Sequence, residues 1–572
     1  MSDIRAKFLT GVLLAMILGA VFLAVHVGAA FTPTGHEYSW NIFRLGGDMV
    51  MRGTPWPSAA TPAAIVGVIL VLALFTVLLA WRARRAARKR GAVSNEHLAS
   101  KAEVRSFLEK ARRAEVRRLH PSLAVTSFGL AVGVVLGSRK WLYQGWEDTG
   151  VYVFGNRQGK TSAVVVRHMA DAPGALVLTS TKPDGVREAL ALRSHLGSVY
   201  LFDPNGIHRD ADAAPDFIFN PLDAVTSYQS AQELAGIFEA STKTGDERGG
   251  DAQFDSSGRN LLACAFLAAA NDDLPLSTVW QWLSDQDGDA IANRLTVTGL
   301  VGPAAVVTGI LATHERTRTS TFATAHRMAS ALAYDELLAW TDTAGNEGVR
   351  RFDPAAFVGS RDTLVLLAAQ ETGSAGAILT ALVRAVFKAA EKEANRHGGR
   401  LSVPLVMELD ECANIVRWPE LPSLYSVAGS RGIIISSYFQ NRSQALEAFG
   451  KNGWDTMWSN ARIAVLGPGV KDDDFLKSLS NLAGEHDEIT HGSSTSRDGQ
   501  LSMSTNTRRQ SSLTASQLAA LPKWHMVLFP ANGRPVTMKA KPWFEDKKLT
   551  RRIKHPESAP AAAAVNSKVA QS

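Results

Sequence analysis

Cysteine is nearly absent from this sequence of 572 residues, which contains only Cys264 and Cys412. Two thiols cannot build a disulfide framework, and they cannot build a zinc site that needs several cysteines. We therefore interpret both as buried thiols of a protein in a reducing cytoplasm. The sequence also shows no module that would read a particular DNA sequence.

Charged residues make up only 20% of the chain and hydrophobic residues 46%, which suits a globular protein with additional apolar surface. The net charge of +7 and the pI near 9.3 suggest anionic partners, such as nucleic acid or lipid head groups. A chain of this length can bury several hydrophobic cores. We therefore expect two or three domains.

Lys, Arg, Asp and Glu are missing from two long apolar segments near the N-terminus, residues 8–31 and 63–81. As a helix rising 1.5 Å per residue, the second would reach roughly 28 Å, close to the hydrocarbon thickness of a bilayer. The alternative for the first is a cleaved signal peptide, for which the run is long. The pattern predicts two transmembrane helices.

The segment after the second apolar run, RARRAARKR (residues 82–90), is dense in arginine. By the positive-inside rule this flank is cytoplasmic, so both termini lie inside and residues 32–62 form a short external loop. Residues 95–120 have a helical pattern, either a basic juxtamembrane helix on anionic lipid or a solvated charged face. The apolar stretch 123–137 is too short to span and is typical of a strand.

One residue is missing from an apparent phosphate-binding loop in VYVFGNRQGKTSAVVV, residues 151–166. The usual pattern places four residues between Gly and Gly-Lys-Thr/Ser; here there are three, unless Phe154 occupies the first glycine position. A strand, a glycine-containing loop and a helix start are what a nucleotide phosphate requires. Lys160 would reach the outer phosphates, and the Thr161 hydroxyl would bind magnesium. The predicted nucleotide-binding residues are Gly155, Asn156, Arg157, Gln158, Gly159, Lys160, Thr161 and Ser162.

A second set of candidate residues lies about 250 residues downstream. An apolar strand over 403–409 ends in Asp410 and Glu411, where an acidic residue can hold magnesium and the next can polarise the attacking water. Two acids can also merely mark a helix start, but Gly159-Lys160-Thr161 upstream favours the catalytic interpretation. The apolar stretch 431–440 ends in Gln440, positioned to sense the terminal phosphate. Together these features predict a site that hydrolyses ATP with Mg²⁺.

These motifs resemble the type IV secretion coupling proteins of the TraG/TraD conjugative DNA transfer family. The resemblance runs over most of residues 1–545. It rests on the two predicted spans and on VYVFGNRQGKTS, FNPLDAV, MELDECANIVRWPELPSLYSVAGSRGIIISSYFQNRSQALEAFG and LTASQLAALPKWHMVLFPANGRPV. The sequence departs from the family in the short loop and in STKPD (residues 180–184), where many relatives read Asp-x-Lys-Gly-Glu.

The resemblance implies an α/β fold, a RecA-like P-loop ATPase domain with an inserted all-α domain, preceded by two transmembrane helices. Helical patterns between residues 231 and 338 and a return of β-rich runs at DTLVLLAAQ support this independently. The expected divisions are a membrane anchor (1–90), a juxtamembrane segment with the first part of the ATPase domain (91–225), the all-α domain (226–345), the second part of the ATPase domain (346–545) and a disordered tail (546–572).

The resemblance further implies an ATPase of the bacterial inner membrane, with most of the chain cytoplasmic. It would deliver a DNA–protein substrate, such as a relaxase with single-stranded DNA, to the components of a type IV secretion channel. Six subunits would surround a channel, and an arginine from each neighbour would complete the ATP site: Arg431, with Arg417 as second choice, although both also fit ordinary surface arginines. Alternatives are another DNA or protein translocase of the superfamily, or a non-hydrolysing membrane receptor.

The polar segment 490–512 ends in paired arginines, Arg508 and Arg509. One interpretation is a loop or hairpin facing a DNA channel, whose arginines contact phosphates without reading sequence. The other is an exposed flexible loop. The sequence leaves both open.

Overall fold

The structure is a computed structural model that describes residues 2–32, 35–90, 98–124, 126–183, 185–210, 213–242, 252–342, 346, 348–369, 375–495 and 501–558. The chain divides into two compact units, residues 1–92 and 93–572. Each unit is described by itself.

The first unit contains the helices α1 (Ser2–Phe31), α2 (Ile42–Met51) and α3 (Ala60–Arg90). Within α1 and α3, Gly11–Phe31 and Ala60–Leu78 are long and apolar enough to cross a membrane. The two helices pack closely, since a Cβ on Gly28 would lie 2.4 Å from the backbone nitrogen of Ala60. The predicted pair of long apolar helices is therefore confirmed, although their location in a membrane stays a prediction.

The second unit is built on an 11-stranded sheet with the order β2-β1-β15-β14-β11-β3-β10-β9-β4-β8-β5. The strands from β11 to β5 are parallel, and β14, β15, β1 and β2 continue the sheet antiparallel. The bounds are β1 Leu130–Val135, β2 Trp141–Gln144, β3 Gly150–Val153, β4 Leu176–Ser180, β5 Val199–Phe202, β8 Thr363–Leu367, β9 Leu405–Leu409, β10 Ile433–Phe439, β11 Ile463–Leu466, β14 His525–Pro530 and β15 Val536–Lys539. The predicted α/β class is confirmed. The strands predicted within 123–137, at the start of 151–166, within 403–409 and within 431–440 are confirmed as β1, β3, β9 and β10.

The register of the parallel strands brings distant segments to one edge of the sheet. Strand β10 lies between β3 and β9, with Phe439 opposite Val153 and Ser437 opposite Leu409. Because parallel strands end at the same edge, the residues that follow β3, β9 and β10 become neighbours. This edge holds the site.

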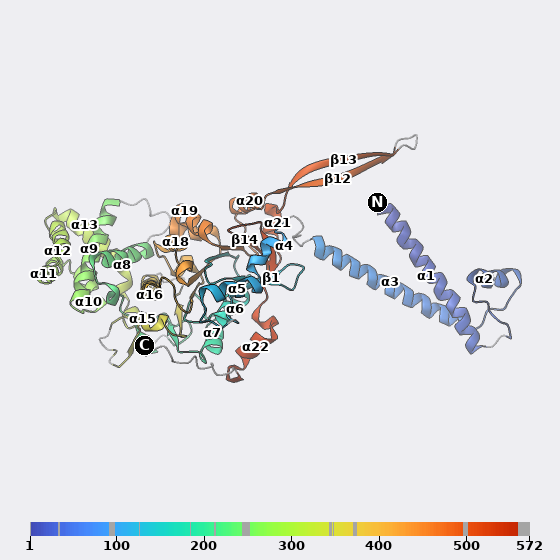
Figure 1. The fold of residues 1–572 in the computed structure, drawn as a ribbon, viewed down its shortest axis with the longest axis horizontal. Helices are drawn as coiled ribbons and strands as arrows, with labels where there is room; N and C mark the ends of the chain where they lie inside the picture. The colour runs from blue at the N-terminus through green and yellow to red at the C-terminus, as the bar shows by residue number, and fades with distance from the viewer. Residues whose placement is uncertain are drawn as a thin grey trace. The chain divides into compact units, whose positions relative to one another are not determined.

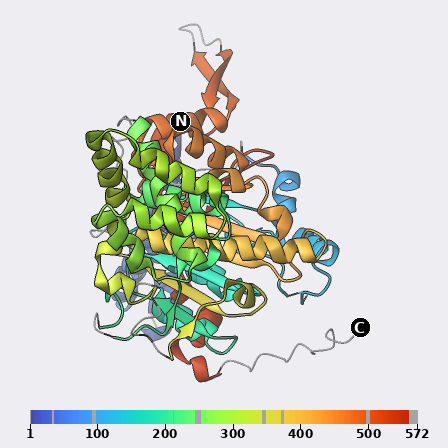
Figure 2. The ribbon, with the colours of Figure 1, turned by 90° about the vertical axis from the view of Figure 1, so that its left-hand side faces the viewer.

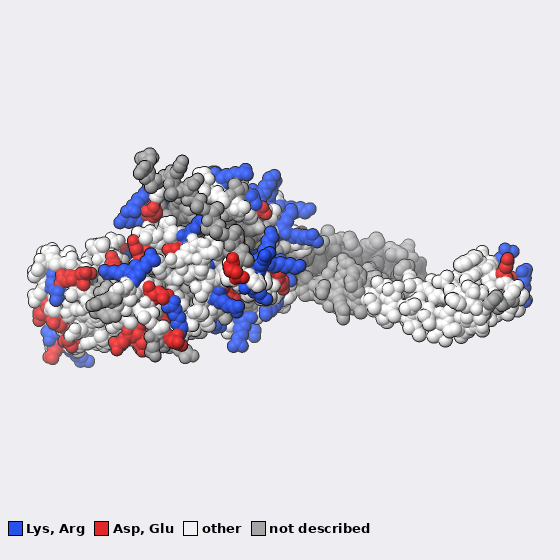
Figure 3. Space-filling view, turned by 90° about the horizontal axis from the view of Figure 1, so that it is seen from below, with Lys and Arg blue, Asp and Glu red and all other residues white. Residues whose placement is uncertain are grey.

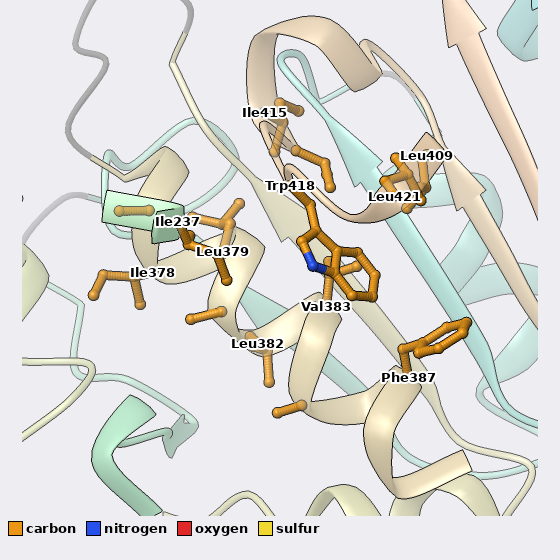
Figure 4. Close-up of a cluster of buried hydrophobic side chains, with 14 of the residues drawn as sticks. Ile237, Ile378, Leu379, Leu382, Val383, Phe387, Leu409, Ile415, Trp418 and Leu421 are labelled. Atoms are coloured by element: carbon orange, nitrogen blue, oxygen red, sulfur yellow. The ribbon is translucent and has the colours of Figure 1, made fainter. Parts of the chain in front are cut away.

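Helices cover both faces of the sheet, because side chains of a buried parallel strand alternate between two cores. Val151 and Val153 enter one hydrophobic cluster, whereas Tyr152 and Phe154 enter the other. In the first cluster the Trp418 ring points toward helix α16 (Figure 4), and its centroid lies 5.3 Å from that of Phe387. The helices around the sheet are α6 Val166–Asp171, α7 Val186–Arg193, α15 Pro354–Val358, α16 Gly376–Arg396, α17 Cys412–Ile415, α18 Leu421–Leu424, α19 Arg442–Asn460, α20 Asp473–Leu482 and α21 Ala515–Ala519.

The helices between β6 (Phe217–Ile218) and β7 (Arg350–Arg351) form the all-α part, as the helical pattern predicted. They are α8 Tyr228–Thr242, α9 Ala252–Asn271, α10 Leu276–Ser284, α11 Gly288–Val297, α12 Val301–Leu311, α13 Glu315–Met328 and α14 Asp335–Leu338. Figures 1 and 2 show these green helices packed together on one side of the second unit. The domain limits at residues 226 and 345 stay predictions.

Residues 490–495 and 501–511 of the predicted polar segment belong to a long antiparallel hairpin, formed by β12 (Glu485–Thr495) and β13 (Leu501–Ser511). In Figures 1 and 2 this hairpin projects from the other elements of its unit. The structure therefore has a hairpin here, and its position facing a DNA channel stays a prediction.

Two predictions at the borders of the second unit need correction. The expected continuous helix over 95–120 is interrupted, because Leu108 is extended (φ −83°, ψ 155°) between the pair α4 (Lys101–Val104) and η1 (Arg105–Phe107) and helix α5 (Glu109–Leu119). The expected disordered tail begins with helix α22 (Lys547–Lys554). Leu549 and Ile553, four residues apart, give α22 a buried apolar face. The predicted disorder of 559–572 lies outside the described residues.

Candidate active site

A cavity of about 570 Å³ lies at the edge where β3, β9 and β10 end. The whole predicted phosphate loop, residues 155–162, lines it on one side, and Asp410, Glu411 and Gln440 line it on another. Ligands of open parallel sheets bind at this carboxyl edge of the strands. The structure therefore brings the three sequence signals into one cavity.

The shortened loop is a compact turn that only glycine permits at both ends. Phe154 continues the strand ladder, with its amide donating to the carbonyl of Phe439 at 3.0 Å, so the loop proper begins at Gly155. A Cβ on Gly155 would lie 2.3 Å from the carbonyl oxygen of Gly469. At Gly159 the φ angle is +83°, and a Cβ would meet the Trp524 ring at 2.2 Å. Both glycines are thus required by close neighbours.

Lys160 projects from this loop onto the two acidic residues after β9. Its Nζ lies 3.0 Å from Oδ1 of Asp410 and also contacts Oε1 of Glu411. Burial lowers the pKa of Lys160, but the two carboxylates outweigh that effect and raise the pKa above its ordinary value. The ammonium group is therefore charged, and here it is held by protein carboxylates.

Thr161 and Asp410 form the pair of oxygen ligands expected for magnesium. The Thr161 hydroxyl donates to Oδ2 of Asp410 at 3.0 Å, and the Thr179 hydroxyl fixes the Asp410 carbonyl at 2.7 Å. In the part of the chain that the structure describes, no cluster of three or more His, Cys, Asp or Glu forms a metal cage. A hydroxyl and a single carboxylate fit Mg²⁺, which is usually bound by one or two carboxylates together with phosphates and waters.

Glu411 is held in place by groups from three segments. Its backbone is left-handed, with φ +53°, a conformation that costs a residue with a side chain of order 1 kcal/mol. Besides Lys160 on one oxygen, Gln440 Nε2 donates to Oε2 at 2.7 Å and Asn414 Nδ2 at 3.2 Å. A carboxylate fixed in this way can orient and deprotonate a water molecule.

The cavity also contains residues that the sequence did not identify as part of the site. Lys182 follows β4, Arg187 and Glu188 lie on α7, and Trp543 comes from the C-terminal segment; all four line the cavity. The departure at STKPD contained Lys182, so a lysine at the end of a strand neighbouring β9 was an available signal. Nothing in the local sequence around Trp543 pointed to the site.

Neither candidate arginine reaches this chain's own cavity. Arg431 precedes β10 whereas Gln440 follows it, and seven residues at about 3.3 Å separate the two ends by roughly 23 Å. Arg431 forms an ion pair with Glu391 of α16. Nη2 of Arg417 lies 3.4 Å from Oε1 of Glu447. Any role of either residue at a nucleotide would have to be in another subunit.

The two arginines of the hairpin are opposite acidic residues in the register of the two strands. Arg508 is paired with Glu488 in the register, and Arg509 with Asp487. Nε of Arg509 lies 3.9 Å from Oδ1 of Asp487, and both side chains are largely exposed. Both hairpin arginines are therefore accessible, and a carboxylate lies close to Arg509.

Residues 404–523 match a protein-family model described as the TraM recognition site of TraD and TraG. No curated protein sequence matches the chain. The matched segment contains β9, Asp410, Glu411, β10 and the hairpin, and it ends one residue before Trp524.

Solved structures share the fold. The unbound monoclinic form of the bacterial conjugative coupling protein TrwBdeltaN70 aligns with a TM-score of 0.53 at 14% identity, over 75% of this chain and 91% of that one. The plasmid coupling protein TrwB with the GTP analogue GDPNP gives 0.52 at 13%, over 75% and 92%. TrwB with ADP and Mg²⁺ gives 0.51 at 15%, over the same shares. The alignments confirm the predicted architecture of a sheet with an all-α part.

Proposed function

We propose that this chain is a membrane-anchored ATPase that delivers a conjugative DNA–protein substrate to a type IV secretion channel. The proposal starts from the resemblance of the chain to the TraG/TraD type IV coupling proteins. One observation carries the proposal. Lys160, Thr161, Asp410, Glu411 and Gln440 meet in one cavity at the carboxyl edge of the sheet, which is the set of groups that phosphoryl transfer to water requires.

The contacts among these residues suggest how each would act. Lys160 would exchange the carboxylates for the outer phosphate oxygens, which leaves Oε1 of Glu411 free to accept a proton from water. Thr161 and Asp410 would hold Mg²⁺, which supplies charge neutralisation at the phosphates when bound. Gln440, which is hydrogen-bonded to Glu411 and follows strand β10, would sense the terminal phosphate.

The nucleotides bound by the similar structures support the choice of cofactor. TrwB has been solved with GDPNP, with ADPNP and with ADP and Mg²⁺. By analogy we propose ATP and Mg²⁺ for this chain. The Lys160 ammonium and the neighbouring Lys182 and Arg187 supply the positive charge that a triphosphate needs.

The proposed partners are single-stranded DNA bound without sequence preference, a relaxase or other secreted protein, the channel components and the lipid bilayer. On the face drawn in Figure 3, carboxylates are frequent over the end formed by the all-α helices, whereas Lys and Arg crowd the opposite end of the second unit. Such an uneven charge favours polyanions at one end. We further propose a homohexamer in the bacterial inner membrane, anchored by α1 and α3.

ATP turnover by the full chain in lipid nanodiscs tests the function. We expect Mg²⁺-dependent hydrolysis that single-stranded DNA accelerates, and a Lys160→Ala chain without turnover as the matched control. Nucleotide binding without hydrolysis would favour the docking receptor instead. Hydrolysis accelerated by duplex DNA and not by single strands would favour a different translocase.

A further inference from the structure

We propose that Trp543 forms a nucleobase subsite, on which the purine ring of the bound nucleotide stacks. The inference rests on the proposed function, because it assigns the second half of the same cavity. Of the described residues that line the cavity, Trp543 is the aromatic one. The cavity is also lined by the phosphate loop and by Val166, Arg187 and Glu188.

The cavity has two chemically different parts. The loop, Lys160 and the acidic pair provide the charges and backbone groups that suit phosphates. Trp543 provides an aromatic surface that a phosphate chain does not need but that matches the flat face of a base. A ligand that is anionic at one end and aromatic at the other, a purine nucleoside triphosphate, uses both parts.

The segment that contains Trp543 is held in place by Arg167 of helix α6. Arg167 directly follows Val166 on α6, and its guanidinium donates to the Lys541 carbonyl at 3.1 Å and to the Asp546 carboxylate at 3.2 Å. These two contacts bracket Trp543 in the chain. Arg167 is buried, and the two contacts hold the segment against helix α6.

Further hydrogen bonds hold the backbone of Trp543 itself. Its carbonyl accepts from the Thr550 hydroxyl and from the Asp546 amide, both at 3.0 Å. Trp543 is half-buried and lines the cavity. A fixed, partly open aromatic ring loses little conformational entropy when a base stacks on it.

The two neighbouring aromatic rings are engaged differently. The Trp524 ring lies against Gly159, where it supports the loop. Phe544 is 54% exposed and does not line the cavity. It meets Trp543 edge-on, at 5.8 Å between centroids and 77° between planes. Phe544 is therefore a matched control for removal of an aromatic side chain at the same place.

Stacking sets the specificity of the subsite. Every base has a π-face, so stacking on an aromatic residue tolerates different bases. We therefore expect ATP and GTP to bind with comparable affinity. Loss of the ring should weaken both nucleotides by about 5- to 150-fold and leave inorganic triphosphate unaffected.

Binding of ATP, GTP and inorganic triphosphate to the full chain in nanodiscs tests the subsite. Trp543→Ala should raise the Kd of both nucleotides and leave that of triphosphate unchanged, Trp543→Phe should restore most of the affinity, and Phe544→Ala should bind like the parent. Circular dichroism verifies that each variant is folded.

Three results would overturn the subsite. If Trp543→Ala weakens triphosphate as much as ATP, the ring only supports the loop. If Trp543→Ala binds all three ligands like the parent, or if the parent binds ATP no better than triphosphate, no base is held there, although the phosphate site stands. A parent chain that binds none of the three ligands would remove the proposed function as well.

Discussion

Nε2 of Gln440 donates a hydrogen bond of 2.7 Å to Oε2 of Glu411, at the ends of the two adjacent strands β10 and β9. The other oxygen of Glu411 is in contact with Lys160. Glu411 therefore connects the phosphate loop to the strand that ends in Gln440. Any ligand that binds Lys160 in place of Glu411 therefore removes the ammonium contact from this carboxylate.

Substitutions at Lys160 and Glu411 should separate binding from turnover. Lys160→Ala removes a charge-assisted contact to the outer phosphates, worth about 2 kcal/mol, and should weaken ATP binding by about 30-fold. Glu411→Gln should retain binding but slow hydrolysis by about 10²- to 10⁴-fold, because an amide is a poor base. Equilibrium binding and phosphate release measure the two effects. Parent-like hydrolysis in both variants would show that the assigned site is wrong.

Removal of Arg431 should abolish turnover and spare ATP binding if this arginine acts on a neighbouring subunit's nucleotide. A trans arginine stabilises charge that develops on the transferred phosphate and adds little in the ground state. Glu391→Ala is the matched control, because it breaks the same ion pair but keeps the arginine.

Mixing Arg431→Ala with Glu411→Gln chains extends this test to the assembly. Some mixed interfaces would pair an intact Glu411 with an intact Arg431, so partial activity should return. The absence of rescue, or equal losses in Arg431→Ala and Glu391→Ala, would mean that the arginine only supports helix α16.

The hairpin arginines should contribute to DNA stimulation rather than to basal turnover. Arg508 and Arg509 are exposed on β13, and removing a side chain that binds a DNA phosphate should weaken DNA binding and lower its salt dependence. We expect the Arg508→Ala/Arg509→Ala chain to need several-fold more single-stranded DNA for half-maximal stimulation. A chain with Asp487→Asn should need less, because it removes an acidic neighbour. Unchanged DNA titrations in both chains would assign DNA binding to another part of the protein.

Reporter fusions should place both termini in the cytoplasm and a fusion at residue 53, an exposed non-helical position between the two expected spans, outside. The basic segment 82–90 follows the second apolar run, and an even number of spans returns the chain to the same side. The internal fusion is the control that the reporters respond to location. An external signal from the C-terminus would disprove the topology.

Neither cysteine should react in the folded protein. Burial raises the pKa of the Cys264 thiol and of the Cys412 thiol to about 12 each, so at pH 8 the reactive thiolate is scarce. Titration with Ellman's reagent should detect no thiol in the native chain and both in guanidinium chloride. Fast modification of the native protein would show that the core around one of them opens.

The sequence by itself determined the features that are local in the chain. The two apolar runs could be identified because span length and charge are read over consecutive residues. The loop 155–162 and the Asp410-Glu411 pair could be proposed as parts of one site because each is a short motif at the end of an apolar strand, and their roles stay predictions. The α/β class followed because buried parallel strands are continuously hydrophobic. The basic tail helix was missed because Leu549 and Ile553 are its only buried residues.

Only the tertiary structure decided which distant residues meet. The position of β10 between β3 and β9 sets Gln440 beside Glu411 and places Arg431 at the opposite edge of the sheet. Strand order is fixed by packing across the whole unit and leaves no local trace in the sequence. The same holds for Trp543, which lines the cavity and lies between Lys541 and Asp546, the two residues that the buried Arg167 binds.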